Sequence, residues 1–178
     1  MMSNGQIVRS NIATLSYCDP QNFKQENEQV FRRHWGLACL TKEVKEPGAY
    51  VTSKIGSDSI IVVRDKERLR AFHNVCPHRG AEITTGQGVT KDFQCPYHAW
   101  TYGLDGQLIR IPGLKRFQET ISLRQLRTEI WGPFVFVCDD PDIEPLSHYY
   151  GDLFDYFQKK VDLTEIASFG HMEEITFE

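Results

Sequence analysis

Two short pairs of cysteine and histidine lie in the middle of the sequence. Cys76 and His78 are separated by one residue, Cys95 and His98 by two, and sixteen residues lie between the pairs. A proline follows each cysteine directly. Thiolates and imidazoles are side chains that bind zinc and iron–sulfur clusters in proteins. The spacing therefore predicts a metal centre with two sulfur and two nitrogen ligands.

Two kinds of centre accept these four ligands. Zinc binds two Cys and two His in a tetrahedron, often from pairs a few residues apart. A Rieske 2Fe–2S cluster has two thiolates on one iron and two histidines on the other. In the usual zinc finger a cysteine pair precedes a histidine pair, whereas each pair here contains one of each. Each loop can thus reach both ends of an elongated cluster, so this order favours the Rieske cluster over zinc.

The residues next to the four ligands favour rigid loops. Pro77 and Pro96 each fix the backbone and remove an amide donor, and Gly80 permits close approach of the backbone to a bulky inorganic group. The remaining histidines have no partner at metal-ligand spacing and are interpreted as ordinary surface or core residues: His34, His73, His148 and His171.

The sequence after Gly36 predicts the scaffold that positions these loops. Short runs rich in β-branched and aromatic residues alternate with glycines, which is typical of an antiparallel β-sandwich. Asp105-Gly106 predicts a two-residue hairpin turn. The expected strands fall near residues 37–42, 50–55, 59–65, 69–75, 92–97, 100–104, 107–111 and 131–140.

Helical patterns flank the expected strands on both sides. Asp19 followed by proline is typical of a helix N-terminus, and apolar residues recur at helical spacing to Trp35, so we expect a helix over 20–35. An aromatic stripe after Pro145 predicts a second helix over 146–160, with the stripe packed in the core. The 178 residues suit one domain with attached helices.

The composition excludes several classes of function. The chain has 20 basic and 24 acidic residues, a net charge of −4, so neither nucleic-acid nor membrane binding is predicted. The first twenty residues have no apolar stretch typical of a signal peptide, and no apolar run spans a bilayer. Cys39 and Cys138 lie in apolar runs typical of buried free thiols. We therefore expect a cytoplasmic protein.

The two ligand-bearing stretches also resemble a known family. "CPHRG" at 76–80 and "CPYHAWTYGLDGQL" at 95–108 are similar to the Rieske domain of the α subunits of Rieske non-haem iron oxygenases, the aromatic-ring-hydroxylating family. "WGPFVFVCDDP" at 131–141 resembles the last strand of that domain. The resemblance implies that a 2Fe–2S cluster is bound by four side chains: Cys76, His78, Cys95 and His98.

Departures from the high-potential Rieske proteins of respiratory complexes imply a low reduction potential. Ala81 and Tyr97 stand where those proteins have disulfide cysteines, and Trp100 stands where a serine hydroxyl bonds a cluster sulfur. Fewer hydrogen bonds to the sulfurs disfavour the added electron. Trp100 and Tyr102 are interpreted as packing that shields the cluster, and Arg79 as a solvated residue or a docking contact for a partner.

The resemblance further implies a larger protein. In the family, electrons come from a ferredoxin or flavin reductase and pass to a mononuclear Fe(II), held by two histidines and a carboxylate, in a catalytic domain of a neighbouring α subunit. The family's α subunits form trimers, with or without a β subunit. No carboxylate–histidine–histidine spacing of that kind occurs here, so we expect no catalytic residues for oxygen activation in this chain.

The expected division of the chain follows from this resemblance. We expect an N-terminal segment and helix over 1–35, the Rieske domain over 36–145, and a helix with the start of the catalytic domain over 146–178, where "HMEEITFE" is typical of a first strand. Two alternatives remain at this point, a stand-alone Rieske ferredoxin and a zinc-binding interaction module.

Overall fold

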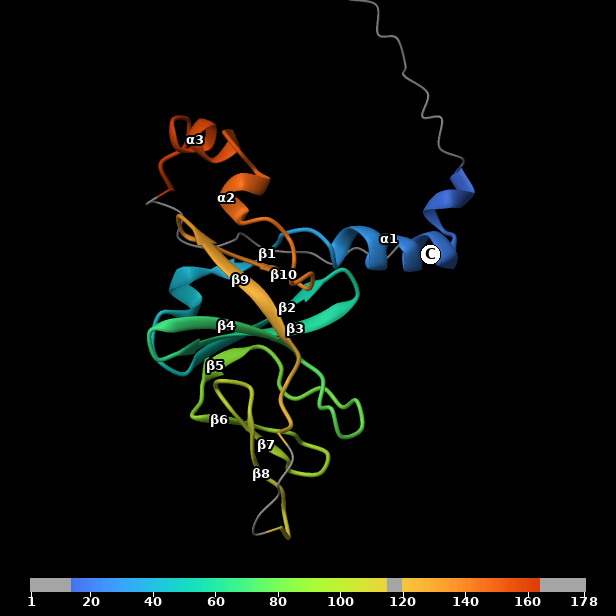
Figure 1. The fold of residues 1–178 in the computed structure, drawn as a ribbon, viewed down its shortest axis with the longest axis vertical. Helices are drawn as coiled ribbons and strands as arrows, with labels where there is room; N and C mark the ends of the chain where they lie inside the picture. The colour runs from blue at the N-terminus through green and yellow to red at the C-terminus, as the bar shows by residue number, and fades with distance from the viewer. Residues whose placement is uncertain (1–13, 115–119, 164–178) are drawn as a thin grey trace, which may run out of the picture.

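The computed structural model describes residues 14–114 and 120–163, in which the strands form two antiparallel sheets (Figure 1). The larger sheet has seven strands, in the order β1 (Gly36–Leu40), β10 (Phe134–Cys138), β9 (Gln125–Trp131), β4 (Arg68–His73), β3 (Asp58–Asp65), β2 (Ala49–Ile55) and β5 (Gln87–Val89). The smaller sheet has three: β6 (Asp92–Gln94), β7 (Thr101–Gly103) and β8 (Leu108–Arg110). Every pair of neighbouring strands in the two sheets is antiparallel, so the predicted antiparallel β architecture is confirmed.

Strand β3 separates two hydrophobic cores because its central residues are buried on both faces. Ile61 and Val63 face the core that also contains both predicted cysteine ligands, while Ile60 and Val62 face a second core. Alternation of side chains along a strand produces this division. Consequently the two loops that carry the predicted ligands pack on a core on one side of the large sheet.

Two strands lie where none was expected. Strand β5 is a fully exposed three-residue edge strand with a central glycine, so it lacks an apolar signal. Strand β9 contains charged residues, which weaken its strand signal in the sequence. In the fold they form an ion pair, since Arg127 Nη2 lies 2.9 Å from Glu129 Oε1. The prediction of a strand over 131–140 is wrong at its start. Gly132, with φ 54°, lies in the turn after β9, and β10 begins at Phe134.

The predicted hairpin is confirmed, but its turn is longer than two residues. Strand β7 ends at Gly103 and β8 begins at Leu108, and Asp105 Oδ1 accepts a hydrogen bond from the Gln107 amide at 3.1 Å. Gly106 adopts φ 82°, and a Cβ atom at this position would lie 2.5 Å from the Phe72 ring. The turn glycine therefore also closes the core that contains the predicted ligands.

The N-terminal helix is shorter and less regular than expected. The helix α1 (Pro20–Glu26) follows a 3₁₀ turn (Thr14–Tyr17). Asp19 caps its N-terminus, because the Asp19 carboxylate accepts a hydrogen bond from the Gln21 amide at 2.8 Å. It continues as a π-helical turn, η2 (Asn27–Phe31), and a further 3₁₀ turn, η3 (Thr41–Val44), follows β1. The apolar residues of α1 and η2 are largely exposed, and Trp35 beyond them is buried.

The C-terminal helix is divided. The structure has α2 (Leu146–Tyr149) and α3 (Leu153–Gln158), and Gly151 with φ 49° lies in the break. Phe154 stacks on Trp131 with ring centroids 4.0 Å apart. Core packing of the aromatic stripe is therefore confirmed for part of it, whereas Leu153 and Phe157 are nearly half exposed.

Trp35 connects the two helical ends of the described chain. It lies in a third core with Leu146, its Nε1 donates to the Glu144 carbonyl at 2.9 Å, and its own carbonyl accepts the Tyr150 hydroxyl at 3.2 Å. Figure 1 shows α2 and α3 above the β9–β10 end of the large sheet and the small sheet at the opposite end. This anchor is therefore distinct from the core around the predicted ligands.

The five cysteines are free thiols in the structure. Cys39 and Cys138 are buried as expected, and burial raises the pKa of Cys39 to about 12. The helices of residues 14–114 and 120–163 are too short or too polar to cross a membrane. The strand expected within "HMEEITFE" and the first thirteen residues lie outside the described residues.

Candidate metal centre

The first ligand pair lies on a tight loop that follows β4. The Cys76 amide donates to the Ala81 carbonyl at 2.8 Å, and the Gly80 amide donates to the Cys76 carbonyl at 2.8 Å. Gly80 has φ 72°, a left-handed conformation that favours glycine. The left-handed backbone alone is a reason for glycine at position 80. The expected close approach of the Gly80 backbone to an inorganic group stays a prediction.

The second pair lies on a loop of the same design between β6 and β7. The Cys95 amide donates to the Trp100 carbonyl at 2.8 Å, and the Ala99 amide donates to the Cys95 carbonyl at 3.0 Å. Ala99 occupies the position equivalent to the glycine of the first loop and also has a positive φ, 57°. The two loops thus repeat one backbone pattern, counted from the cysteine, and lie side by side (Figure 1).

Both sulfurs face inward. Cys76 is 1 % and Cys95 2 % exposed, and both belong to the core that contains Phe72 and Tyr102. The Tyr102 hydroxyl lies 3.1 Å from Cys76 Sγ. Burial, then the hydrogen bond to Cys76, then the nearby charges of both thiols raise the pKa of Tyr102. Toward a thiolate, this hydroxyl can only donate.

Sequence reasoning interpreted Tyr102 as packing and missed its hydrogen bond to sulfur. The structure confirms its burial, since the side chain is 0 % exposed. A fully buried tyrosine usually has a partner for its hydroxyl. The only signal in the sequence for this hydrogen bond is the position of Tyr102, four residues after the predicted ligand His98.

Both imidazoles lie on the outer side of the loops. The His78 and His98 ring centroids are 4.8 Å apart, with His78 half-buried and His98 exposed. Local desolvation, then the positive fields of His78 and Arg79, lower the pKa of His98. The lowered pKa favours the neutral imidazole, which is the form that binds a metal.

Two aromatic rings support the imidazoles. Trp100 is parallel to His78, with centroids 4.5 Å apart and an interplanar angle of 1°. Tyr97 lies against His98 at 3.9 Å and is itself 59 % exposed. The contact of Trp100 supports its interpretation as a shield on one side, while the outer edge of His98 remains open to a partner.

The arrangement of donors fits a two-iron cluster better than a single zinc ion. A tetrahedral zinc site gathers its four ligands around one point. The four predicted ligands instead lie as a buried sulfur pair and an outer imidazole pair, which fits the two ends of a Rieske cluster.

The other described histidines have different partners. His73 Nε2 lies 3.0 Å from Asp139, and His148 lies 3.0 Å from Glu144. His34 packs against an aromatic ring, with centroids 5.8 Å apart. His171 lies outside the described residues.

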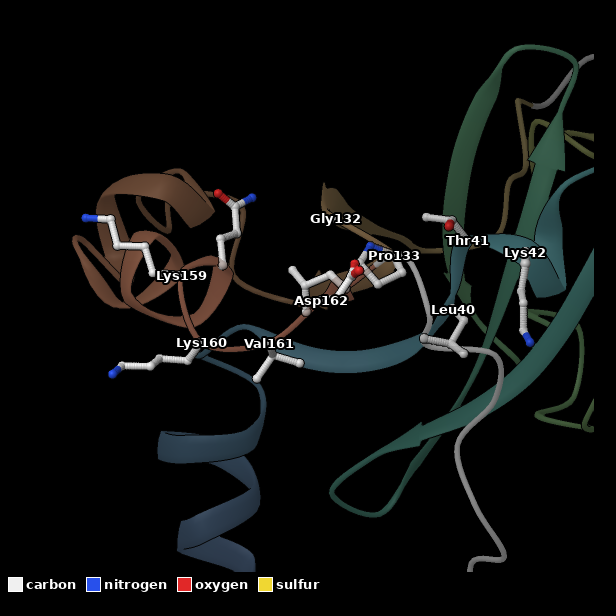
Figure 2. A pocket seen from close by; sticks show the side chains of 11 residues that line it. Leu40, Thr41, Lys42, Gly132, Pro133, Lys159, Lys160, Val161 and Asp162 are labelled. Carbon is white, nitrogen blue, oxygen red and sulfur yellow. The ribbon is translucent and has the colours of Figure 1, made fainter.

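A groove of about 790 Å³ lies away from the two loops, where α3 ends beside the β9–β10 turn (Figure 2). None of its lining residues comes from either loop: Leu40, Thr41, Lys42, Gly132, Pro133, Gln158, Lys159, Lys160, Val161, Asp162 and Leu163. The groove is therefore separate from the two loops that carry the predicted ligands.

Comparison with known proteins gives the same answer as the geometry. The family model for the Rieske [2Fe-2S] domain matches residues 34–127. The chain is 37 % identical over 133 residues to choline monooxygenase, chloroplastic, of Spinacia oleracea, covering 72 % of this chain and 30 % of the relative. It is 37 % identical over 130 residues to the carnitine monooxygenase oxygenase subunit of Acinetobacter baumannii, covering 70 % of this chain and 35 % of the relative.

Solved structures agree on the fold. Naphthalene 1,2-dioxygenase with bound indole superimposes with a TM-score of 0.76 at 32 % identity, over 81 % of this chain and 34 % of that chain. The apo form of the quaternary ammonium Rieske monooxygenase CntA superimposes with a TM-score of 0.73 at 31 % identity, over 82 % and 44 %. The chain spans about a third of the length of the curated relatives described above.

Proposed function

Because the chain belongs to the Rieske [2Fe-2S] domain family, we propose that it is the electron-transfer part of an oxygenase α subunit. The observation that carries this proposal is the buried thiol pair below an accessible imidazole pair on two loops of one design. The similarity to oxygenases covers 72 % of the chain, which favours this function over a stand-alone Rieske ferredoxin.

Each of the four side chains has a distinct role in this proposal. Cys76 and Cys95 would hold one iron as thiolates, and His78 and His98 would hold the other through one ring nitrogen each. When bound, the cluster accepts and returns one electron at a time. The core around the cysteines excludes water, and Tyr102 donates a hydrogen bond to the Cys76 sulfur.

The surface beside the histidines suits a redox partner. Val75 and Tyr97 are 45 % and 59 % exposed, and Arg79 is exposed and forms no ion pair with the described residues. Apolar contact with a single cation fits a transient docking site for an acidic ferredoxin or a flavin reductase. Inter-subunit electron transfer is described for a quaternary ammonium Rieske monooxygenase of similar structure, which supports a neighbouring α subunit, with or without a β subunit, as the acceptor.

The same proposal covers the parts outside the cluster domain. We assign 1–35 to an N-terminal segment, 36–145 to the Rieske domain and 146–178 to the connection with a catalytic domain that holds a mononuclear Fe(II). Free thiols in the described chain support a cytoplasmic location. Relatives are named for choline and carnitine and a structural neighbour for naphthalene, so the proposed substrate of the whole protein belongs to one of two classes, quaternary amines or aromatic rings.

Loss of the cluster on replacement of single ligands tests the assignment. Cys76→Ser and His98→Ala should purify colourless, with little iron or acid-labile sulfide, because the loops lose a ligand that binding requires. Matched controls are Cys18→Ser and His148→Ala, which change an exposed cysteine and an exposed histidine outside the loops. A variant of either ligand with the wild-type 2Fe–2S spectrum would remove that residue from the ligand set.

Stopped-flow reduction tests the docking role of Arg79. Arg79→Glu should slow reduction by an acidic ferredoxin, with the difference shrinking as salt screens the charges. Lys45→Glu reverses an exposed charge outside the loops and should leave the rate nearly unchanged. Equal rates for wild type and Arg79→Glu at low salt would place the docking surface elsewhere.

A further inference from the structure

A buried asparagine lies just before the first ligand loop. Asn74 is 0 % exposed and stands two residues before Cys76. Its Oδ1 accepts the amide hydrogens of Ile83 at 3.1 Å and Thr84 at 3.2 Å. Both partners lie beyond the loop, so this single side chain connects the two ends of the segment that carries Cys76 and His78.

The amide nitrogen of the same side chain completes the connection. Asn74 Nδ2 lies 2.7 Å from the Thr84 carbonyl, 3.0 Å from Ser59 Oγ and 3.1 Å from Glu82 Oε1. The Asn74 backbone amide donates to the Ser59 carbonyl at 2.9 Å. Three acceptors share two hydrogens, so every polar atom of the side chain is bound and its orientation is fixed.

The second ligand loop is closed differently. Strands β6 and β7 pair directly below it, with Gln94 opposite Thr101. Below the first loop, the ladder is reduced to an isolated bridge between Val75 and Glu82. The Asn74 side chain occupies the place where a second rung of backbone hydrogen bonds would otherwise close the loop.

We propose that Asn74 is the positioning residue of the first ligand loop. It holds Cys76 and His78 in place through side-chain hydrogen bonds, as the β6–β7 ladder holds Cys95 and His98 through backbone bonds. This inference rests on the proposed function, because the loop matters as a cluster ligand loop. The side-chain hydrogen bonds of Asn74 go to Ser59, Glu82, Ile83 and Thr84 and not to a predicted ligand atom, so its effect on the loop is indirect.

Asn74→Asp is the sharpest substitution because it keeps the shape of the side chain. The carboxylate still accepts from Ile83 and Thr84, but it faces the Thr84 carbonyl and Glu82 without a hydrogen to donate. Asn27→Asp is the matched control. Asn27, at the start of η2, is also buried. Its side-chain oxygen likewise joins two segments, because it accepts a hydrogen bond from the Ser57 backbone amide at 2.9 Å.

The experiment compares iron release to a chelator and the EPR spectrum of the reduced protein, with thermal unfolding as the common reference. We expect both variants to unfold at a lower temperature. Asn74→Asp alone should shift the g-values and release iron about tenfold faster, equivalent to about 1.4 kcal/mol at the loop. Wild-type g-values and release rate in Asn74→Asp would overturn the proposal and leave Asn74 a purely structural residue.

A second variant decides the question if Asn74→Asp does not fold. Ser59→Ala combined with Glu82→Ala removes two acceptors of Asn74 Nδ2 and leaves the backbone pairs intact. Faster iron release than wild type supports the proposal, and an unchanged rate contradicts it. Absence of a cluster from the wild-type chain would instead contradict the proposed function, so the two failures are distinguishable.

Discussion

At the scale of single residues, Tyr102 is the side chain whose hydroxyl contacts the sulfur of the predicted ligand Cys76. Its hydroxyl hydrogen bond to Cys76 stabilises the more negative, reduced form of a bound cluster more than the oxidised form. Tyr102→Phe should therefore lower the midpoint potential by about 40 mV, if the bond favours the reduced form by about 1 kcal/mol. Protein-film voltammetry measures this shift.

Tyr50→Phe is the matched control for that substitution. Tyr50 packs edge-on against Phe93 near the same core, but its hydroxyl bonds Thr84 rather than a sulfur. Its removal should leave the potential within a few millivolts of wild type. Equal shifts in the two variants would mean that general loosening of the core, and not the bond to sulfur, sets the potential.

The non-ligand cysteines should differ sharply in reactivity. Burial raises the pKa of Cys39 to about 12, so at pH 8 its thiol stays protonated and a thiolate-directed reagent finds almost no nucleophile. Cys138 is also buried with a raised pKa, whereas Cys18 is exposed. Mass spectrometry after maleimide treatment should find Cys18 labelled in the native protein and the other two only after denaturation. Rapid native labelling of Cys39 would contradict its burial.

The sequence predicts the four ligands because their spacing is local, and their assignment stays a prediction. The roles of Asn74 and Tyr102 were not predicted, because they depend on contacts across the fold: Asn74 with Ser59, and Tyr102 with a sulfur 26 residues earlier. Single-sequence patterns report neighbours along a strand or helix and carry little information about such pairs.

At the scale of elements, the two loops carry different residues, Gly80 and Ala99, at their equivalent left-handed position. Both residues are left-handed, which costs a residue with a Cβ atom about 1–2 kcal/mol. Gly80→Ala should lower the free energy of unfolding by about that amount, although a new Cβ would meet no atom within 4 Å. Chemical denaturation measures the change.

Ala99→Gly is the reciprocal substitution and should have the opposite sign. Relief of the left-handed conformation is partly offset by the chain entropy of glycine, about 0.5–1 kcal/mol, so the expected gain in unfolding free energy is at most about 1.5 kcal/mol. Destabilisation by Ala99→Gly of the size seen for Gly80→Ala would show that packing, and not φ, decides these positions.

Elements with strong periodicity were predicted well, and the exceptions have physical causes. The buried run of β3 gave an unambiguous strand. The helix expected over 146–160 is divided at Gly151, which takes φ 49°. Phe154 after the break stacks on Trp131, and Tyr150 before it lies against Phe136, with ring centroids 6.0 Å apart. Strand β9 was missed because it contains charged residues, and the ion pair between Arg127 and Glu129 can be recognised only in the folded structure.

At the scale of the whole molecule, the Trp35 anchor and the ligand core are separable. Trp35→Ala should cost about 3–5 kcal/mol of unfolding free energy, since it empties a buried site and frees the Glu144 carbonyl. At about 20 °C the folded fraction should nevertheless contain the same iron per chain and show the same visible spectrum, because the core that contains Trp35 shares no residue with the core around the predicted ligands.

Trp35→Phe refines the measurement, because it keeps an aromatic ring and removes the indole donor to Glu144. It should be destabilised by less than the alanine variant and show the wild-type spectrum. A changed cluster spectrum in either Trp35 variant would mean that the three cores respond as one.

The meeting of β4 and β9 has a consequence for recombination. Phe72 pairs with Gln125, and the His73 amide donates to the Arg124 carbonyl at 2.9 Å, so the chain leaves the large sheet at residue 74 and returns beside its point of departure. Residues 74–123, with both ligand loops, are thus joined to the rest like an inserted module with adjacent ends. Such a module can be exchanged between homologous genes without altering the strand order of its host, provided that β5 keeps its pairing with β2. The host and the insert are then free to diverge at different rates.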